Sequence, residues 1–433
     1  MPALIPATLV CNLRTGTWYF HSKEQTDTKH PQVFWGVPLT PIKISAYNDL
    51  LKPPGSLSMK AMLASGKRPI IGPLIGILSA ENPDGSLKGN FNNYKAIMEA
   101  GQNIGGIVFA FTPSNVDWKK RIIRGKIFDK NNNQWVTCSF PFPNVVYNRI
   151  QDRAHEKKEN SQWCIQRFLS HPGVTLYNRG FFNKGEVISI LKKSPKLNKY
   201  IPETRALLSK ADLITMLKKH GALYLKPANN RLGSGIIRVT KSASQKSYTM
   251  HYYAYDKQLE KYKAYSIHQL WSKIQQQVVH PPYIVQQAIP LATVSKCPFD
   301  CRVLVQKNHQ GLWQISGLGI RIAAHSQSIT THVPRGGRIG TPKNVLQQAF
   351  PRQKPAQIAQ RVHRLCIATA KKLEQHYHLL GEMSIDVGLD GNGRPWLFEA
   401  NAKPMKFDEH EIRKKQLGQV IRYAQFLTFK RFS

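Results

Sequence analysis

Acidic residues are scarce in this sequence. Its 433 residues include 25 Asp and Glu against 62 Lys and Arg, which gives a formal net charge of +37. Such an excess attracts polyanions or an acidic substrate. The basic residues come as dispersed pairs and triples, such as 119–121 and 413–415, without a zinc-finger, helix-turn-helix or aromatic RNA-binding pattern. They therefore indicate solvated basic faces, and specific nucleic-acid binding is not expected.

Long apolar runs are also missing. A membrane-spanning helix needs about 20 consecutive apolar residues, and the best candidate, residues 70–80, contains Gly72, Pro73 and Gly76. This run is better interpreted as a buried strand. The first residues lack a charged segment followed by a hydrophobic one, so no secretory signal is expected. With 41% hydrophobic and 20% charged residues, the composition suits a globular protein.

Cysteine is infrequent, and its six copies are scattered. Only Cys297 and Cys301 lie close together, and no second Cys or His pair follows them. Because a structural zinc site usually has four such ligands, zinc is not expected here. Free thiols in a reducing cytosol are the expected state.

The order of strand-like and helix-like segments predicts three regions. Residues 1–66 hold short β-type runs broken by Pro and Gly, which indicates a small β-rich module. Residues 67–182 alternate buried strands with a helix at 93–101, an order typical of a parallel sheet with flanking helices. Residues 183–433 hold several hairpins and a helix at 355–376. The expected fold class is therefore α/β and α+β.

The most informative segment is a predicted β-hairpin at 382–404. Apolar residues alternate with small or polar ones in its first half, which is the period of a half-buried strand. In its second half the alternating apolar residues are Trp396, Phe398 and Ala400. Asn392-Gly393 lies between the halves and is the preferred pair for a two-residue type I′ turn.

That turn would place Asp386 directly opposite Glu399, whereas a turn at Asp390-Gly391 would separate them. Like charges directly opposite on one face destabilise a hairpin. A bound divalent cation offsets this repulsion, with Asn401 as a third oxygen donor on the same face. Oxygen-only ligands fit Mg²⁺. The alternative is an ordinary solvated hairpin edge.

A second candidate is Lys226, which a glycine-containing loop at 229–235 follows. Glycines let backbone N–H groups close on phosphate oxygens, and a lysine on a strand supplies a fixed positive charge. The segment is neither a Walker A motif nor a dinucleotide fingerprint. An ordinary hairpin loop is the alternative, but the acidic hairpin downstream favours phosphate binding.

Further polar residues lie on predicted strands. Gln286 or Gln287 can meet an adenine edge, with the backbone near Ile289 completing the contact; surface glutamines on an edge strand are the alternative. Asp300 and Arg302 share one strand face, so that Asp300 can orient Arg302 toward a phosphate, unless the two form a structural ion pair.

A flexible basic loop begins at Arg335. It is suited to covering a phosphate or an anionic substrate, with an exposed connector as the alternative.

Together these segments resemble the ATP-grasp superfamily, and within it the YheC/YheD endospore-coat-associated family, over residues 68–430. The resemblance rests on residues 72–77, 146–150, 225–235 and 300–302, and above all on the hairpin that carries Asp386, Glu399 and Asn401. It implies an ATP-grasp domain at 183–433, with ATP between two α+β subdomains, behind a Rossmann-like domain at 67–182.

The resemblance also implies residue roles. Phosphates contact Lys184 and Lys226 beneath a loop that contains Gly233, Ser234 and Gly235. The nucleotide-binding set is completed by Gln286, Gln287, Ile289 and Asp300, and Mg²⁺ (with Mn²⁺ as the alternative) is held by Asp386, Glu399 and Asn401. Two positions depart from the family pattern: the ribose-binding acid falls at Thr293, and the loop at 330–334 lacks the expected asparagine.

These expectations define an ATP-dependent carboxylate–amine, or carboxylate–thiol, ligase that acts through an acylphosphate on an acidic substrate. Arg302 and Arg335 would stabilise the acylphosphate, and no Ser/His/Asp or Cys/His set is needed. The resemblance implies a mother-cell cytoplasmic protein that associates with the spore coat and its polyanionic material. The alternatives are a non-catalytic nucleotide-binding coat protein and a charge-driven nucleic-acid-binding protein.

Overall fold

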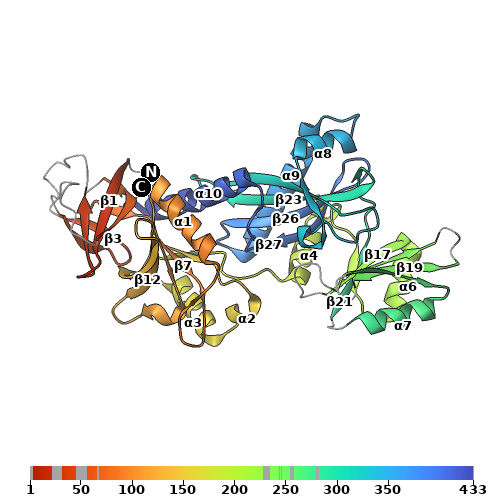
Figure 1. The fold of residues 1–433 in the computed structure, drawn as a ribbon, viewed down its shortest axis with the longest axis horizontal. Helices are drawn as coiled ribbons and strands as arrows, with labels where there is room; N and C mark the ends of the chain where they lie inside the picture. The colour runs from red at the N-terminus through yellow and green to blue at the C-terminus, as the bar shows by residue number, and fades with distance from the viewer. Residues whose placement is uncertain are drawn as a thin grey trace.

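A computed structural model describes residues 3–21, 32–44, 56–65, 68–227, 235–242, 244, 246–253, 258–278 and 282–432. In this part of the chain a small closed barrel is followed by an α/β sheet and by two six-stranded sheets. Figure 1 shows the barrel at one end of an elongated molecule and the green sheet, formed by residues 204–287, at the other.

The predicted β-rich module is a closed barrel. Its strand order is β1 (Leu4–Asn12), β2 (Thr17–His21), β4 (Thr40–Ile44), β3 (Val33–Trp35), β6 (Ile70–Gly72) and β5 (Ser56–Ala64). The barrel shares one hydrophobic core with the sheet that follows it. At their junction the ring of Trp18 lies 5.3 Å from that of Phe140, which stacks on Phe109 at 4.1 Å. The two parts therefore pack as one body.

The predicted parallel sheet is confirmed. Its parallel strands are β10 (Ile107–Phe111), β7 (Leu74–Leu78), β14 (Val145–Asn148) and β15 (Thr175–Tyr177). The antiparallel strands β12 (Ile122–Asp129) and β13 (Gln134–Pro141) extend it. One face is covered by α1 (Phe91–Ile104) and α10 (His410–Phe429), and the other by α3 (Glu159–Ser170). The C-terminal helix thus returns to the α/β sheet (Figure 1).

Residues 204–287 form what we call the middle sheet. Its order is β16 (Thr204–Ala206), β21 (Tyr283–Gln287), β17 (Ala222–Pro227), β18 (Ile237–Lys241), β19 (Tyr248–Tyr253) and β20 (Leu259–Ala264). Helices α6 (Lys210–His220) and α7 (Ile267–Gln277) pack on one face, where Leu223 and Leu225 are buried. Because side chains alternate along a strand, Tyr224 and Lys226 point to the opposite face.

The remaining strands form what we call the C-terminal sheet. Its order is β25 (Arg338–Gly340), β24 (Trp313–Ile322), β23 (Cys297–Lys307), β26 (Glu382–Leu389) and β27 (Pro395–Asn401), with β22 (Thr293–Val294) beside β23. Its core packs against α4 (Lys184–Lys192), α8 (Pro342–Ala349) and α9 (Pro355–Tyr377). The predicted helix at 355–376 is α9, and its buried residues recur at helical spacing, including Ile358, Val362, Leu365 and Thr369.

Among the described residues, no helix has the length and apolar character that crossing a membrane requires.

Candidate functional site

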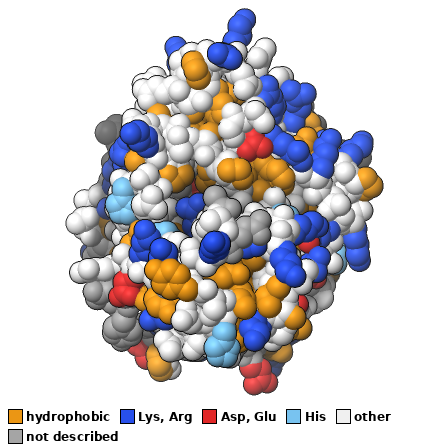
Figure 2. Space-filling view, turned by 90° about the vertical axis from the view of Figure 1, so that its right-hand side faces the viewer, with side chains coloured by type: hydrophobic (Ala, Val, Ile, Leu, Met, Phe, Trp, Pro, Cys, Tyr) orange, Lys and Arg blue, Asp and Glu red, His pale blue; other side chains and the backbone are white. Residues whose placement is uncertain are grey.

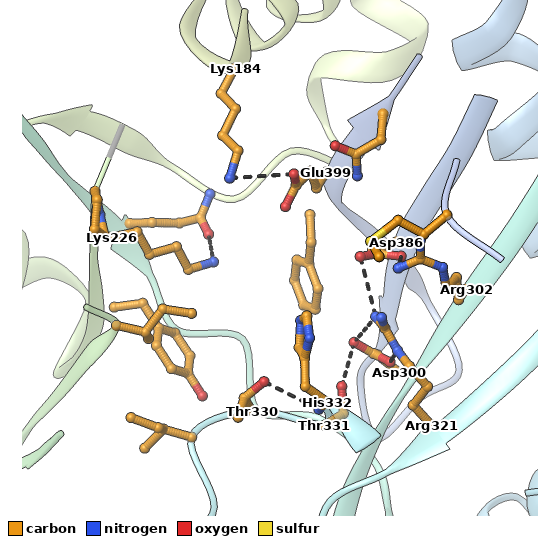
Figure 3. Close-up of a pocket in the computed structure, with 18 of the residues that line it drawn as sticks. Lys184, Lys226, Asp300, Arg302, Arg321, Thr330, Thr331, His332, Asp386 and Glu399 are labelled. Atoms are coloured by element: carbon orange, nitrogen blue, oxygen red, sulfur yellow. Dashed lines mark hydrogen bonds and ion pairs between the residues drawn. The ribbon is translucent and has the colours of Figure 1, made fainter. Parts of the chain in front are cut away.

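A cavity of about 710 Å³ lies where the three sheets meet. It is lined from the α/β sheet by Arg149, from the middle sheet by Lys226 and Gln286, and from the C-terminal sheet by Asp386 and Glu399. Ten Lys and Arg side chains line it, against three carboxylates among the described lining residues. The cavity is therefore suited to an anionic ligand (Figure 3).

The acidic hairpin has a different turn from the one predicted. Gly393 N–H donates to the Asp390 carbonyl at 2.9 Å, and Asp390 N–H donates to the Arg394 carbonyl at 3.1 Å. Gly393 has a φ of 71°, whereas Asn392 is not among the residues with positive φ, which a type I′ turn requires. The prediction of a two-residue Asn-Gly turn is therefore wrong, and the loop has one residue more.

A β-bulge at Phe398 compensates for this longer loop. Val387 pairs with Leu397 but Asp386 pairs with Glu399, which leaves Phe398 as the extra residue. The predicted opposition of the two carboxylates is therefore confirmed, although the predicted turn is wrong. Without the bulge, the three-residue loop would set Phe398 opposite Asp386.

The bulge also changes which side chains face the core. Leu397 and Ala400 are buried in the core, while Phe398 lines the cavity beside Glu399. The prediction that Trp396 and Phe398 share one face with Ala400 is therefore wrong. Gly388 makes room for the ring, because a Cβ there would lie 2.3 Å from Cζ of Phe398.

Each carboxylate of the hairpin is paired with a cation. Oδ2 of Asp386 lies 3.2 Å from Arg321, its Oδ1 lies 3.8 Å from Arg302, and Glu399 lies 3.3 Å from Lys184. Burial opposes ionisation of Asp386, but Arg321 and Arg302 hold its pKa below the ordinary value. The acid therefore stays charged at neutral pH.

Asp300 orients a different arginine from the one predicted. It accepts hydrogen bonds of 2.9 Å from both Nε and Nη2 of Arg321, and one of 2.8 Å from the Thr331 hydroxyl. Arg302 instead faces Asp386 and lies over the ring of Phe407, 5.4 Å from its centroid. The expectation that Asp300 orients Arg302 is therefore wrong.

Arg321 is a site residue that sequence patterns did not identify. It is the direct cross-strand partner of Asp300 in the β23–β24 hairpin. A register shift between Leu304 and Val305 lies between this pair and the hairpin loop, so counting outward from the loop at 308–311 does not bring Arg321 opposite Asp300. Its guanidinium joins Asp300 to Asp386, as Figure 3 shows, and although burial would lower its pKa, these two carboxylates raise it.

Lys226 is part-buried against neutral groups. Its Nζ donates to Oε1 of Gln286 at 2.7 Å, and Nε2 of Gln286 donates to the Thr204 hydroxyl at 2.9 Å. Burial lowers the pKa of Lys226 to about 8. Both ends of the Gln286 amide are thus engaged, and this side chain positions the lysine.

Gln287 and Ile289 also line the cavity. The side-chain oxygen of Gln287 accepts a hydrogen bond of 3.3 Å from Glu203 N–H.

The acidic residues fit an oxygen-ligated cation. Oδ1 of Asp386 is buried and accepts no hydrogen bond from the part of the chain that is described. Such an oxygen requires a partner, and Glu399 and Asn401 line the same cavity. No group of three His, Cys, Asp or Glu side chains suited to a metal occurs among the described residues. The donors present are two carboxylates and an amide, which suit magnesium rather than zinc.

Four predicted residues are not placed in the cavity: two fall outside the described residues, and two do not line it. Gly233 and Ser234 fall outside the described residues. Gly235 accepts a hydrogen bond of 3.1 Å from the Tyr283 hydroxyl and is not among the residues that line the cavity. Arg335 is likewise outside the lining and stacks on Tyr253, 4.2 Å from the ring centroid.

A buried polar network fixes the hairpin against the α/β sheet. Glu382, at the start of β26, accepts hydrogen bonds from the Tyr147 hydroxyl, from Arg149 at 3.4 Å and from Gln306 at 3.1 Å. Just beyond β27, Lys403 pairs with Glu156 and donates to Asn148 at 2.9 Å. Sequence patterns gave no signal for these contacts, because the partners lie 76 positions apart for Gln306 and more than 200 apart for the others.

The family model of YheC/D-like ATP-grasp proteins matches residues 173–427. Two Bacillus subtilis (strain 168) proteins are similar to the chain. The endospore coat-associated protein YheD is 26% identical over 372 residues, which are 83% of this chain and 80% of YheD. The endospore coat-associated protein YheC is 22% identical over 294 residues, which are 68% of this chain and 79% of YheC.

Among solved structures, that of the ATP-grasp ligase PsnB complexed with minimal precursor has a TM-score of 0.49 and 13% identity. The similarity covers 82% of this chain and 99% of that one.

Proposed function

Because this chain belongs to the YheC/D-like ATP-grasp family, we propose that it is an ATP- and magnesium-dependent ligase. It would join a substrate carboxylate to an amine, or to a thiol, through an acylphosphate. The observation that carries the proposal is the pairing of Asp386 with Glu399 inside a cationic cavity, with one buried oxygen of Asp386 lacking a hydrogen-bond donor among the described residues. Family membership supports a ligase-type activity.

Asp386, Glu399 and Asn401 would hold Mg²⁺. The ion would neutralise charge on the triphosphate and on the phosphoryl group that is transferred. Lys184 would exchange its contact with Glu399 for a phosphate once the carboxylate binds the metal. The part-buried ammonium of Lys226 would form a second phosphate contact.

Arg302 and Arg321 would serve the reacting group differently. Arg302 faces the cavity at 3.8 Å from Asp386 and would stabilise charge on the acylphosphate. Arg321, clamped between Asp300 and Asp386, would position the metal-binding carboxylate. Arg335 would need movement of its loop to reach the cavity. No protein nucleophile takes part in this scheme.

We propose an acidic substrate, because the cations lining the cavity outnumber its carboxylates. Association with the endospore coat is also proposed, since the similar proteins YheD and YheC carry that name. The basic surface would bind polyanionic material there.

Turnover is the direct test. The purified protein is incubated with ATP, Mg²⁺ and pooled carboxylates and amines, and phosphate release is followed. Release that requires both a carboxylate and Mg²⁺ is expected. Tight ATP binding without release for any pool would contradict the ligase and favour a non-catalytic nucleotide-binding coat protein.

A further inference from the structure

One face of the middle sheet carries a row of polar and cationic side chains that begins in the cavity. Tyr224, Arg238, His251 and Lys261 are direct cross-strand neighbours on β17, β18, β19 and β20. Their flanking residues Leu223, Val239 and Met250 are buried under α6 and α7, so the row occupies the other face. Tyr224 and Arg238 line the cavity. The row therefore leads from the cavity outward across the sheet.

Three buried nitrogens near this row lack a hydrogen-bond partner among the described residues. They are Nε of Arg238, Nδ1 of His251 and Nη1 of Arg335. The His251 side chain is deeply buried, with the residue 8% exposed. Arg335 reaches this face from the C-terminal sheet and covers Tyr253, two residues from His251. Because buried polar groups in native proteins nearly always have a partner, these nitrogens point to a ligand that carries several hydrogen-bonding groups, with acceptors for the two guanidinium donors.

The charge around the row is unbalanced. Within the described residues, Arg238, Lys261, Lys263 and Arg335 form no ion pair with a carboxylate. The nearest acid in sequence, Glu260, accepts a hydrogen bond from the Tyr252 hydroxyl on the opposite face. Figure 2, which views this end of the molecule, shows many Lys and Arg side chains and few acidic ones.

We propose that this row, with Lys263 and Arg335 beside it, binds an acidic peptide segment that continues from the substrate in the cavity. Strands are about 4.8 Å apart, so Arg238 and Lys261 are separated by roughly 10 Å, a span that about three residues of extended peptide cover. Carboxylates along such a chain would meet the row in turn. The claim that this peptide is part of the substrate rests on the proposed ligase function. The claim that the row binds an acidic peptide does not.

A peptide fits this face better than a nucleic acid does. Single-stranded nucleic acids bind through aromatic rings on which bases stack. Tyr224 and Tyr253 lie on this face, but the ammonium of Lys226 lies over the first ring at 5.3 Å and the guanidinium of Arg335 covers the second at 4.2 Å. The face thus offers charges without an open stacking platform there.

The test measures binding of a fluorescein-labelled deca-glutamate peptide to the full chain by fluorescence anisotropy. The double variant Lys261→Gln/Lys263→Gln removes two exposed cations from the proposed face. Its matched control, Lys210→Gln/Lys218→Gln, removes two exposed cations from α6 on the opposite face. The first variant is expected to weaken binding about fivefold or more and the control to leave it nearly unchanged. A deca-glutamine peptide is expected not to bind.

Equal losses in both double variants would overturn the proposal, because they would indicate only general charge attraction. A ten-residue oligouridylate that binds more tightly than the peptide, and loses affinity in the first variant, would assign the face to nucleic acid instead. The thermal shift with MgATP and the release of phosphate are measured on the same proteins. If the first variant loses peptide binding but keeps the MgATP shift, the row binds the peptide independently of the ATP site. If the protein binds the peptide but releases no phosphate from ATP, only the proposed ligase function is contradicted.

Discussion

At the scale of single residues, two lysines in the cavity differ in what surrounds their ammonium groups. Both lysines are part-buried, but Lys184 pairs with the Glu399 carboxylate, whereas Lys226 donates to an amide oxygen. The pKa of Lys226 is lowered to about 8, mainly by burial. A part-buried ammonium beside a neutral partner is available to an incoming phosphate, because no carboxylate has to be displaced.

The affinity for MgATP should fall as pH rises through about 8, as Lys226 loses its proton. In the protein without ligand the opposite trend applies to stability. Between about 8 and the ordinary 10.5 the unfolded lysine still binds a proton that the folded one has released, so this group's contribution to stability rises with pH. Titration calorimetry from about pH 7 to about pH 9 measures the affinity.

The control for this prediction is Lys226→Arg, whose guanidinium stays protonated over the whole range. Its affinity for MgATP should be nearly independent of pH. A wild-type affinity as flat as that of this variant would show that Lys226 does not contact the triphosphate.

The two carboxylates of the hairpin should respond differently to neutral substitution. Glu399 and its partner Lys184 are 32% and 28% exposed in their side chains, so Glu399→Gln should cost at most about 1 kcal/mol of stability. Asp386→Asn should cost about 1–3 kcal/mol, because buried Arg321 loses a charged acceptor. Both variants should lose the Mg²⁺-dependent part of the thermal shift given by ATP. A shift that survives in both contradicts the metal assignment.

At the scale of elements, the acidic hairpin shows what periodicity can and cannot predict. The opposition of Asp386 and Glu399 was predicted from an Asn-Gly turn that the structure does not have, and only the strands were predictable from alternation. The turn and the bulge at Phe398 were not, because each changes the register by one residue and their effects cancel beside the site. The alternation of apolar and polar residues along the strands does not reveal two register changes that cancel each other. The Asp300–Arg321 pair was hidden for a similar reason, because a register shift between Leu304 and Val305 separates it from the loop of the predicted hairpin.

Gly388→Ala tests the bulge. The added Cβ would lie 2.3 Å from the ring of Phe398 and 2.7 Å from Cδ2 of Leu291, so about 1–3 kcal/mol of destabilisation is expected. Gly388→Ala should lower the free energy of unfolding by less in a Phe398→Ala variant, because the Phe398 ring, the nearer of the two groups, is absent. Urea unfolding of the four proteins of this cycle measures the coupling. Strict additivity would contradict the packing of Phe398 against Gly388.

At the scale of the whole molecule, the excess of positive charge works against compactness. The net charge of +37 is spread over 433 residues, and self-repulsion of such a charge destabilises the folded state. Added NaCl screens this repulsion, since the Debye length falls from about 30 Å at 0.01 M to about 10 Å at 0.1 M.

The midpoint of thermal unfolding should therefore rise with NaCl over this range. Circular dichroism at several salt concentrations measures it, and a glutamate salt serves as control for a specific chloride effect. A midpoint that falls with salt would indicate that the ion pairs lost to screening outweigh the repulsion. Composition predicted the sign of the charge, but the cationic row on the middle sheet depends on the register of three successive antiparallel strand pairs, which composition does not contain.

Helix α10 has a consequence for biosynthesis. Its residues Ile421, Ala424 and Leu427 pack with Ile75 and Ile77 of β7, a strand that leaves the ribosome more than 300 residues earlier. The part of this face of the α/β sheet that α1 does not cover therefore stays exposed while the middle and C-terminal sheets are being synthesised. The nascent chain must keep that apolar face from aggregating until its final helix emerges, which makes it a natural client for chaperones that bind exposed hydrophobic segments.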